Sequence, residues 1–166
     1  QIPAGSASGE ARVSIVGSSS PVEGAVLIQS VRPGIFTANA DGAGVPVGSS
    51  LRYRNGNLVE TLPLFAADSA TGRFVPAPIN LGEPGDVTYL VLYGTGWRNR
   101  TSLSSVRAII GGLEAPVVYA GAQGSYAGLD QMNILLPREI SGRGITDLVV
   151  TFGSVSCNTV QVRPGQ

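Results

Sequence analysis

Glycine and proline interrupt this sequence so often that little or no helix is expected. The 166 residues include 23 glycines and 11 prolines, and no window of about 11 to 18 residues keeps apolar side chains at helical spacing without one of them. Charged residues supply only 13% of the chain, whereas hydrophobic residues supply 43%. This combination favours many short strands and turns, and it predicts an all-β protein.

Apolar or alternating stretches of strand length recur along the whole chain, with turn residues between them. This spacing is typical of a β-sandwich or barrel, and the length fits one domain with a small appendage. We predict strands at residues 11–16, 25–31, 50–54, 57–62, 87–93, 105–110, 115–120, 130–136, 145–152 and 155–162.

Three segments carry more specific predictions. Asn55-Gly56 lies between two strand-like stretches, where it predicts the type I′ turn of a hairpin. Residues 87–93 are almost wholly apolar, so we predict a central strand that is covered on both faces. Residues 65–86 are rich in proline and glycine and predict a long surface connection.

One phrase, Val-Arg-Pro-Gly, occurs at both 31–34 and 162–165. Before each copy stand an aliphatic residue with proline, a Ser/Gly spacer and two strand-like stretches. If 136–163 forms the last two strands of the sandwich, residues 2–32 are an equivalent strand pair. We therefore divide the chain into an N-terminal strand arm, residues 1–32, and a sandwich domain, residues 33–166.

The arm needs a partner, because a lone strand pair is unstable in water. Val13, Ile15, Val26 and Ile28 are the apolar side chains that require cover. Three arrangements supply it: the arm packs on its own domain, it belongs to a tandem array of domains, or it pairs with the sheet edge of another copy. The third arrangement is head to tail and does not close on itself, so it would propagate into a filament.

Four motifs in one order resemble a known family. They are RPGIFT (32–37), VLYGTGW (91–97), APVVYAG (115–121) and GLDQMNILLP (128–137). They resemble the uncharacterised carboxy-terminal domain family of large secreted acidobacterial proteins. The resemblance implies secretion and an immunoglobulin-like β-sandwich at the end of multidomain surface proteins, and it implies no particular reaction.

Most common catalytic schemes lack their residues in this chain. The sequence contains no His and no Lys, which removes Ser-His and Cys-His pairs, the Walker lysine and Schiff-base chemistry. The formal net charge is zero, so we expect no nucleic-acid partner. No apolar run reaches about 18 residues, so we expect no membrane span within the chain. We predict that the protein is not an enzyme and uses no cofactor.

We expect the carboxylates and the single cysteine to have structural roles. Residues 39–44 have the oxygen-rich look of a calcium loop but lack the ligand pattern of an EF-hand, so we expect a plain loop and no metal. Cys157 is expected to be a small buried hydrophobe. Two carboxylates can act as the acid and base of a glycosidase. The candidates all lie among turn residues, where aspartates commonly bond their own backbone instead. They are Asp41, Asp68, Glu83, Asp86 and Asp130.

Aromatic side chains supply an alternative function. Trp97 and Tyr93, with Tyr119 and Tyr126, would form a sugar-stacking platform if they shared an exposed face, and otherwise they belong to the core. Gln131 and Asn133 alternate on an apolar strand and indicate either a partly exposed face or bonds to a neighbouring loop.

The sequence therefore predicts a secreted structural or assembly module with an extracellular location. It would be a subunit of an extracellular filament or a stacking domain of a surface adhesin, joined by β-strand addition. Its partners would be other copies of itself or neighbouring immunoglobulin-like domains. The alternative is a carbohydrate-binding module that contacts surface glycans through Trp97 and Tyr93.

Overall fold

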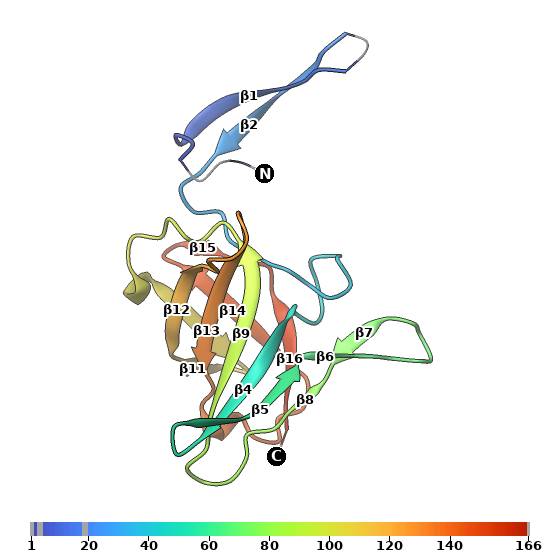
Figure 1. Cartoon of the computed structure of the whole chain (residues 1–166), viewed down its shortest axis with the longest axis vertical. Helices are drawn as coiled ribbons and strands as arrows, with labels where there is room; N and C mark the ends of the chain where they lie inside the picture. The colour runs from blue at the N-terminus through green and yellow to red at the C-terminus, as the bar shows by residue number, and fades with distance from the viewer. Residues whose placement is uncertain (1, 3–4, 18–19, 166) are drawn as a thin grey trace.

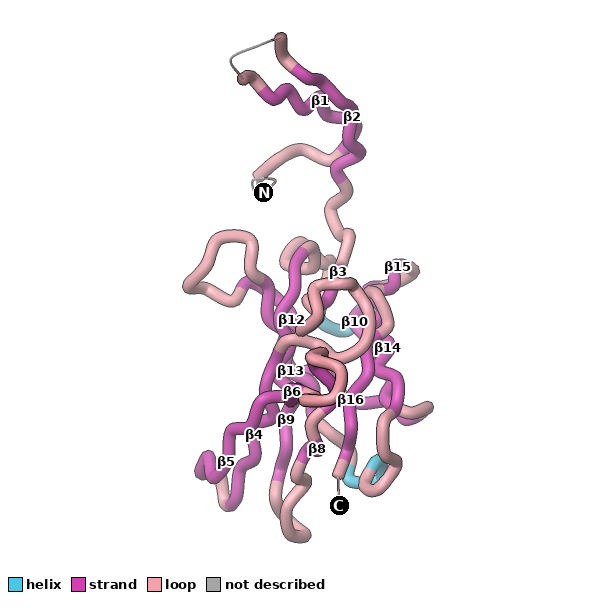
Figure 2. Tube along the Cα trace, turned by 90° about the vertical axis from the view of Figure 1, so that its right-hand side faces the viewer, coloured by secondary structure: helices cyan, strands magenta, loops and turns pink. Residues whose placement is uncertain are grey.

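The computed structural model describes residues 2, 5–17 and 20–165. Its described part is built from β-strands, and the helical elements in it are two single turns of 3₁₀ helix, Leu103–Ser105 and Arg138–Ile140. Two sheets face each other to form a sandwich (Figures 1 and 2). The prediction of an all-β protein is confirmed.

The first sheet has the strand order β11-β10-β14-β16-β8, with β15 beside β14. Neighbouring strands are antiparallel except β16 and β8, which are parallel. The strands are β8 (Pro78–Ile79), β10 (Val106–Ile110), β11 (Leu113–Ala115), β14 (Thr146–Phe152), β15 (Val155–Ser156) and β16 (Val160–Pro164).

The second sheet has the order β12-β13-β9-β4-β5, with β3 beside β9, and all its pairs are antiparallel. The strands are β3 (Gly34–Ile35), β4 (Gly48–Arg54), β5 (Asn57–Pro63), β9 (Val87–Thr95), β12 (Val117–Ala122) and β13 (Asp130–Leu135).

Two hairpins lie outside these sheets. β6 (Phe65–Ala67) pairs with β7 (Phe74–Pro76) in a projection from the sandwich. β1 (Gly9–Ile15) pairs with β2 (Val22–Ile28), and this arm extends well beyond one end of the sandwich (Figures 1 and 2). The β1–β2 hairpin and the sandwich are therefore separate groups of strands.

The core lies between the two sheets. Alternate side chains point inward from each strand, as the two-residue period of a strand requires. Leu90 and Leu92 of β9 and Leu148 of β14 are all fully buried. Trp97 is also fully buried, and its ring stacks on Phe152 of the opposite sheet at a centroid distance of 6.0 Å.

Two glycines allow the chain to turn beside this tryptophan. A side chain at Gly94 would collide with the Trp97 ring at 2.3 Å. A side chain at Gly96 would lie 2.1 Å from the carbonyl oxygen of Arg32, and Gly96 also has a φ of +84°. The Gly-Thr-Gly sequence is therefore needed for close packing at the end of β9.

Strand β9 is central, as predicted, but it is not covered on both faces. Its inward residues are buried, and outward-facing Val91 is buried as well, whereas outward-facing Val87 is 38% exposed and Tyr89 is partly exposed, so the outer face is covered only in part. An antiparallel sheet can leave one face to solvent, and the apolar composition of the strand concealed this alternation.

Residues 65–86 are more than a surface connection. They form β6, β7 and β8, and their second half contributes to the core, because Ile79 and Leu81 are almost fully buried. The prediction of a loop was wrong because prolines, which are typical of loops, here lie within short strands. Pro78 lies on an edge strand, where the missing N–H costs little.

Other predictions hold with small changes. Asn55 and Gly56 have φ values of 50° and 78°, which confirms the expected turn between β4 and β5. The predicted strand at 115–120 divides at Pro116 into β11 and β12. The predicted strand at 155–162 divides into β15 and β16, with the buried Cys157 between them.

Asn158 joins the start of the sandwich to its end. Its Nδ2 donates to the carbonyl oxygens of Ile35 at 3.0 Å and Gly42 at 2.9 Å, and its Oδ1 accepts from the Ile35 amide at 2.8 Å. One amide side chain thus satisfies three backbone groups, two of Ile35 in β3 and one of Gly42 in the loop that follows.

We expect Asn158→Ala to lower the free energy of unfolding by about 1–3 kcal/mol, because it leaves these backbone groups without partners. Urea unfolding followed by Trp97 fluorescence measures the change. Asn57→Ala is the control, because Asn57 makes an exposed bond to a nearby carbonyl. Equal losses in the two variants would contradict the role of Asn158.

Candidate functional site

The β1–β2 hairpin has two different faces. Its register runs from Gly9 opposite Ile28 to Ile15 opposite Val22, so alternate residues share a face. One face is wholly apolar apart from glycine backbone, and it contains all four predicted assembly residues. Its side chains are Ala11, Val13, Ile15, Val22, Val26 and Ile28.

The opposite face carries the polar residues of the hairpin. Arg12 Nη1 donates to Glu23 Oε2 at 3.0 Å across the strand pair. Glu10 and Ser14 lie on the same face, together with the exposed Leu27. The hairpin is therefore amphipathic, with its charges on one side.

The apolar face of the hairpin is open to solvent. Val13 is 46% exposed, Ile15 is 68% exposed and Val22 is 69% exposed. None of the described hairpin residues is buried, and β1 and β2 form a sheet of their own. Of the three arrangements predicted for the arm, packing on its own domain is not the one observed here.

The connection from the hairpin into the sandwich is short, and contacts of Val31 and Arg32 with the sandwich hold its second half in place. Val31 packs against the core, and the Arg32 amide donates to the carbonyl oxygen of Gly96 at 3.0 Å. The chain then continues directly into β3, which pairs with β9. The repeated phrase therefore anchors the arm to the end of the sandwich.

The second copy of the phrase belongs to a complete sheet. β14 pairs with β16 from Thr146 opposite Val162 to Leu148 opposite Val160, as predicted for the last two strands. β10 borders β14 on its other side, and Leu148 and Val160 are fully buried. The arm repeats the strand pair but has neither a third strand nor a facing sheet.

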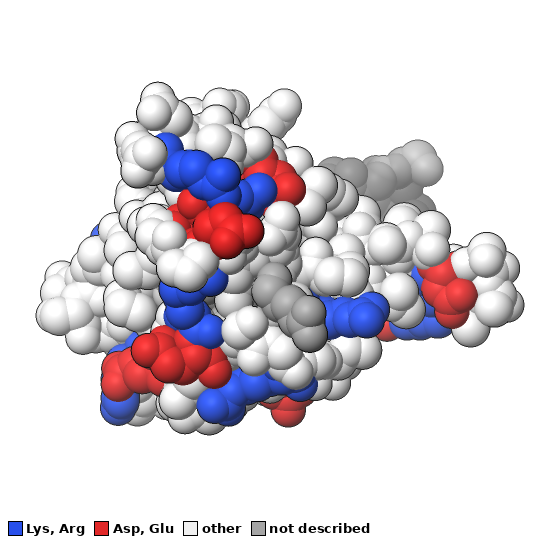
Figure 3. All heavy atoms as spheres, turned by 90° about the horizontal axis from the view of Figure 1, so that it is seen from below, with Lys and Arg blue, Asp and Glu red and all other residues white. Residues whose placement is uncertain are grey.

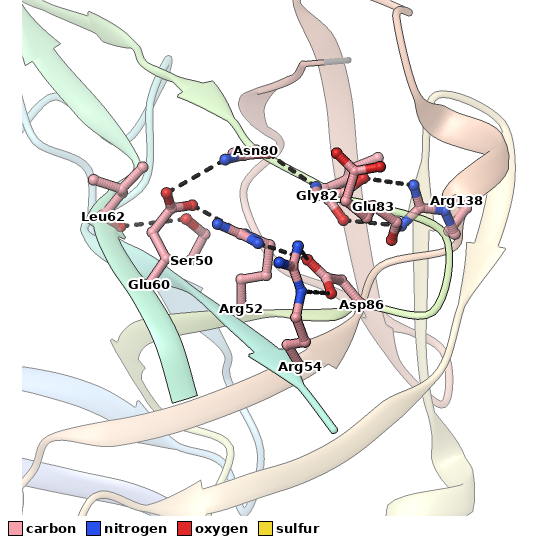
Figure 4. A network of polar contacts seen from close by, with 11 residues as sticks. Ser50, Arg52, Arg54, Glu60, Leu62, Asn80, Gly82, Glu83, Asp86 and Arg138 are labelled. Carbon is pink, nitrogen blue, oxygen red and sulfur yellow. Dashed lines mark hydrogen bonds and ion pairs between the residues drawn. The ribbon is translucent and has the colours of Figure 1, made fainter. Parts of the chain in front are cut away.

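An ion-pair network closes the lower end of the sandwich (Figure 4). Asp86 accepts from Arg54 Nε at 2.7 Å and Nη2 at 2.9 Å, and from Arg52 Nη1 at 2.6 Å. Its carboxylate is only 2% exposed. The hydrogen bonds from Arg54, followed by those from Arg52, hold the pKa of Asp86 well below its usual value, although burial opposes them.

Two further groups extend this network. Arg52 Nε donates to Glu60 at 3.3 Å. Arg138 donates to the carbonyl oxygens of Leu81, Gly82 and Glu83, so one guanidinium holds the loop that leads to Asp86. From below, acidic side chains lie beside basic ones in several clusters (Figure 3).

Two more of the carboxylates that we considered for catalysis, Asp130 and Asp41, also have structural partners. Asp130 is fully buried and accepts from the Trp97 amide at 2.9 Å and from Arg98 Nε at 2.7 Å. Asp41 pairs with Arg73 and caps the amide of Ala43. These two carboxylates are engaged in ion pairs and turns.

Asp68 and Glu83 belong to turns. Asp68 accepts from the Ala70 amide at 3.0 Å and from Thr71 Oγ1 at 2.7 Å, and these bonds lower its pKa. The carbonyl oxygen of Glu83 accepts from the Asp86 amide. The turn-forming role expected of the aspartates is confirmed for Asp41 and Asp68.

The predicted sugar-stacking platform is wrong at its main residue. Trp97 has no exposed surface, because it fills the core against Phe152. Tyr93 is partly exposed on the outer face of β9. Gln131 and Asn133 share that face, where Gln131 Nε2 donates to Asn133 Oδ1 at 2.9 Å. This pair confirms the interpretation of a partly exposed strand face.

Cys157 is free and buried, as expected, and burial raises its pKa to about 12. Within residues 2, 5–17 and 20–165, no group of three or more His, Cys, Asp or Glu side chains is placed to hold a metal ion. The described residues also form no helix that is long and apolar enough to cross a membrane.

Comparisons with protein-family models, curated proteins and solved structures each return no match. The fold class is therefore established by the strands themselves as an all-β sandwich. The immunoglobulin-like family remains a prediction from the four motifs.

Asp86→Asn is expected to destabilise the sandwich most at neutral pH. Because its folded-state pKa lies below the ordinary 3.8, the ionised Asp86 stabilises the fold above about pH 3.8, and this contribution is lost as the pH falls through the lower folded value. The difference in urea midpoint between wild type and variant should therefore be largest at pH 7 and should shrink below pH 3.8.

Glu114→Gln is the matched control, because it neutralises a carboxylate in an exposed ion pair with Arg107. It should lower the urea midpoint less than Asp86→Asn does. A difference between wild type and Asp86→Asn that grows as the pH falls would contradict the account.

Cys157 should be unreactive in the folded protein. With a pKa of about 12, almost no thiolate is present at pH 8, and the sulfur is covered. Ellman's reagent should modify the thiol only after the chain is unfolded in guanidinium. Complete modification of the folded chain at the rate of a free thiol would contradict this placement.

Proposed function

We propose that this chain is a structural module of an extracellular assembly, joined to another copy through its N-terminal hairpin by β-strand addition. The observation that carries the proposal is the uncovered apolar face of β1 and β2 on a hairpin that has no third strand. A module that displays such a surface requires a neighbour to cover it.

The free energy available at this surface is large. Complete burial of one Val or Ile side chain stabilises by about 1.5–3 kcal/mol, and the face offers five such side chains, of which Val26 and Ile28 are already partly buried. Ordering and desolvation oppose association, so only part of this energy appears as affinity. A hairpin that is already formed loses less entropy on binding than a disordered segment does.

Strand β5 is the acceptor that the sandwich offers best. It is a sheet edge of seven residues, the same length as β1 and β2. Leu58 is 53% exposed and Val59, the extra residue of a bulge opposite Arg52 and Tyr53, is 49% exposed. Because a bulge protects an edge locally, an added strand would pair on either side of Val59. The one charged residue of β5, Glu60, bonds Arg52 and Asn80. An exposed, weakly charged edge accepts an added strand readily.

The positions of donor and acceptor favour a chain of modules. The hairpin extends from one end of the sandwich, and β5 begins near the other end (Figure 1). A copy that donates at one end and accepts elsewhere makes a head-to-tail contact, which extends into a filament when it does not close.

The extracellular location and the immunoglobulin-like family rest on the resemblance to secreted acidobacterial proteins. The repeated phrase adds a second form of the same proposal, in which the neighbour is another domain of one long polypeptide. In that form, the equivalents of β10 and of the second sheet would cover the hairpin.

The assembly state of the full chain tests the proposal. Val13→Arg places a charge on the apolar face, whereas Ser14→Arg places the same charge on the opposite face of the same strand. We expect concentration-dependent oligomers or filaments in wild type and in Ser14→Arg, and monomers in Val13→Arg, by light scattering and electron microscopy.

Val59→Lys tests the acceptor, because lysine on an edge strand opposes strand addition. It should shorten or abolish the filaments while the circular dichroism spectrum stays unchanged. A wild-type chain that remains monomeric at high concentration would contradict joining between copies. The repeated strand pair would then indicate a tandem array instead.

A further inference from the structure

We infer that the outer face of the second sheet binds a neutral polysaccharide. This site is separate from the hairpin and from the edge strand, and it does not depend on the assembly proposed above. We define the tyrosine face by six side chains: Tyr53, Tyr89, Tyr93, Tyr119, Gln131 and Asn133.

The strand register places these side chains together. Tyr89 of β9 lies opposite Leu51 of β4. The next pair on the same face, two residues along each strand, is Tyr53 opposite Val87. On the other side of β9, Gln131 lies opposite Tyr93. Asn133 lies opposite Val91 of β9 and Tyr119 of β12, so the face is continuous across four strands.

The face points away from the core. The alternate residues of the same strands, such as Leu90, Leu92 and Met132, are fully buried between the sheets. In Figure 1 the face is toward the viewer, and no other element crosses β4 and β9. Tyr53, Tyr89 and Tyr93 are partly exposed on this face, whereas Val91, between Tyr89 and Tyr93, is only 6% exposed.

A hollow lies at one end of the tyrosine face. The rings of Tyr53 and Tyr89 meet edge to face, with centroids 5.9 Å apart at 84°. The hollow has a volume of about 480 Å³, within the range of ligand sites. Its lining is uncharged and consists of Tyr53, Asn55, Gly56, Gly85, Val87 and Tyr89.

The chemistry of these groups suits a sugar chain. Aromatic rings pack against the C–H faces of pyranose rings, and tyrosine hydroxyls can bond sugar hydroxyls, except that the hydroxyl of Tyr119 already donates to the Ala122 carbonyl oxygen. Gln131 and Asn133 are bonded to each other through one amide end each, so Gln131 Oε1 and Asn133 Nδ2 can bond sugar hydroxyls. An amide pair of this kind is poorly suited to an apolar strand.

The charge of the site selects among sugars. The strand residues that form the tyrosine face include no Asp, Glu, Lys or Arg, and the hollow is likewise uncharged. A polysaccharide rich in carboxylates or sulfates would gain no ion pair in this hollow, because the guanidinium near the tyrosine face, that of Arg100, lies beside Tyr119 at the β12 edge of the sheet. The ligand that fits is therefore a neutral, hydroxyl-rich chain.

Affinity electrophoresis of the full chain tests the inference. The probes are mixed-linkage β-glucan, galactomannan and dextran, with alginate as an acidic comparison, and sedimentation with cellulose and chitin covers insoluble chains. We expect retention by at least one neutral probe and not by alginate. Tyr89→Ala should weaken that retention about tenfold, which is the loss expected for one stacking ring.

Tyr126→Ala is the matched control, because Tyr126 is 70% exposed in a loop outside the tyrosine face. Gln131→Ala is a second variant that removes no ring, and it should weaken retention if Tyr89→Ala fails to fold. Equal retention of the two tyrosine variants, or no retention by any neutral probe, would overturn the inference. The inference would also be overturned if Tyr89→Ala reduced self-association and left retention by the polysaccharide unchanged. That result would make this face a contact between copies.

Discussion

A β-sheet is stable in water only when its apolar face is covered, and this requirement separates the two parts of the chain. In the sandwich, each sheet covers the other, so that Leu92 and Leu148 have no exposed surface. In the arm, the same kind of strand pair leaves Ile15 68% exposed. Because an isolated hairpin has marginal stability, the arm depends on a neighbour that the sandwich of the same chain does not provide in this structure.

Buried ion pairs fix the two ends of the sandwich. At the arm end, Asp130 holds the Trp97 amide and Arg98, and thereby places the tryptophan that bridges the sheets. At the opposite end, Asp86 gathers Arg52 and Arg54. Removing one partner from such a pair leaves a buried charge without compensation.

Local patterns predicted the strands, the turn at Asn55 and the strand pair that ends the chain, because turn chemistry and strand periodicity depend on nearby residues. The sequence leaves the burial of Trp97 open between core and exposed face, since it depends on Phe152 in the opposite sheet. The arginine partners of Asp86 are also distant from it in sequence, because Arg54 lies 32 residues and Arg52 lies 34 residues before it. The tyrosine face needs the register of four strands, which no single stretch of sequence reveals.

Hydrogen exchange of the β1 and β2 amides, measured across a range of protein concentrations, tests most directly whether the arm requires a neighbour. At concentrations where the chain is monomeric, these amides should exchange rapidly while those of β9 stay protected. As the chain assembles, protection should appear in β1 and β2 and at the β5 edge. Strong protection of the hairpin in the dilute monomer, or no change on assembly, would contradict the account.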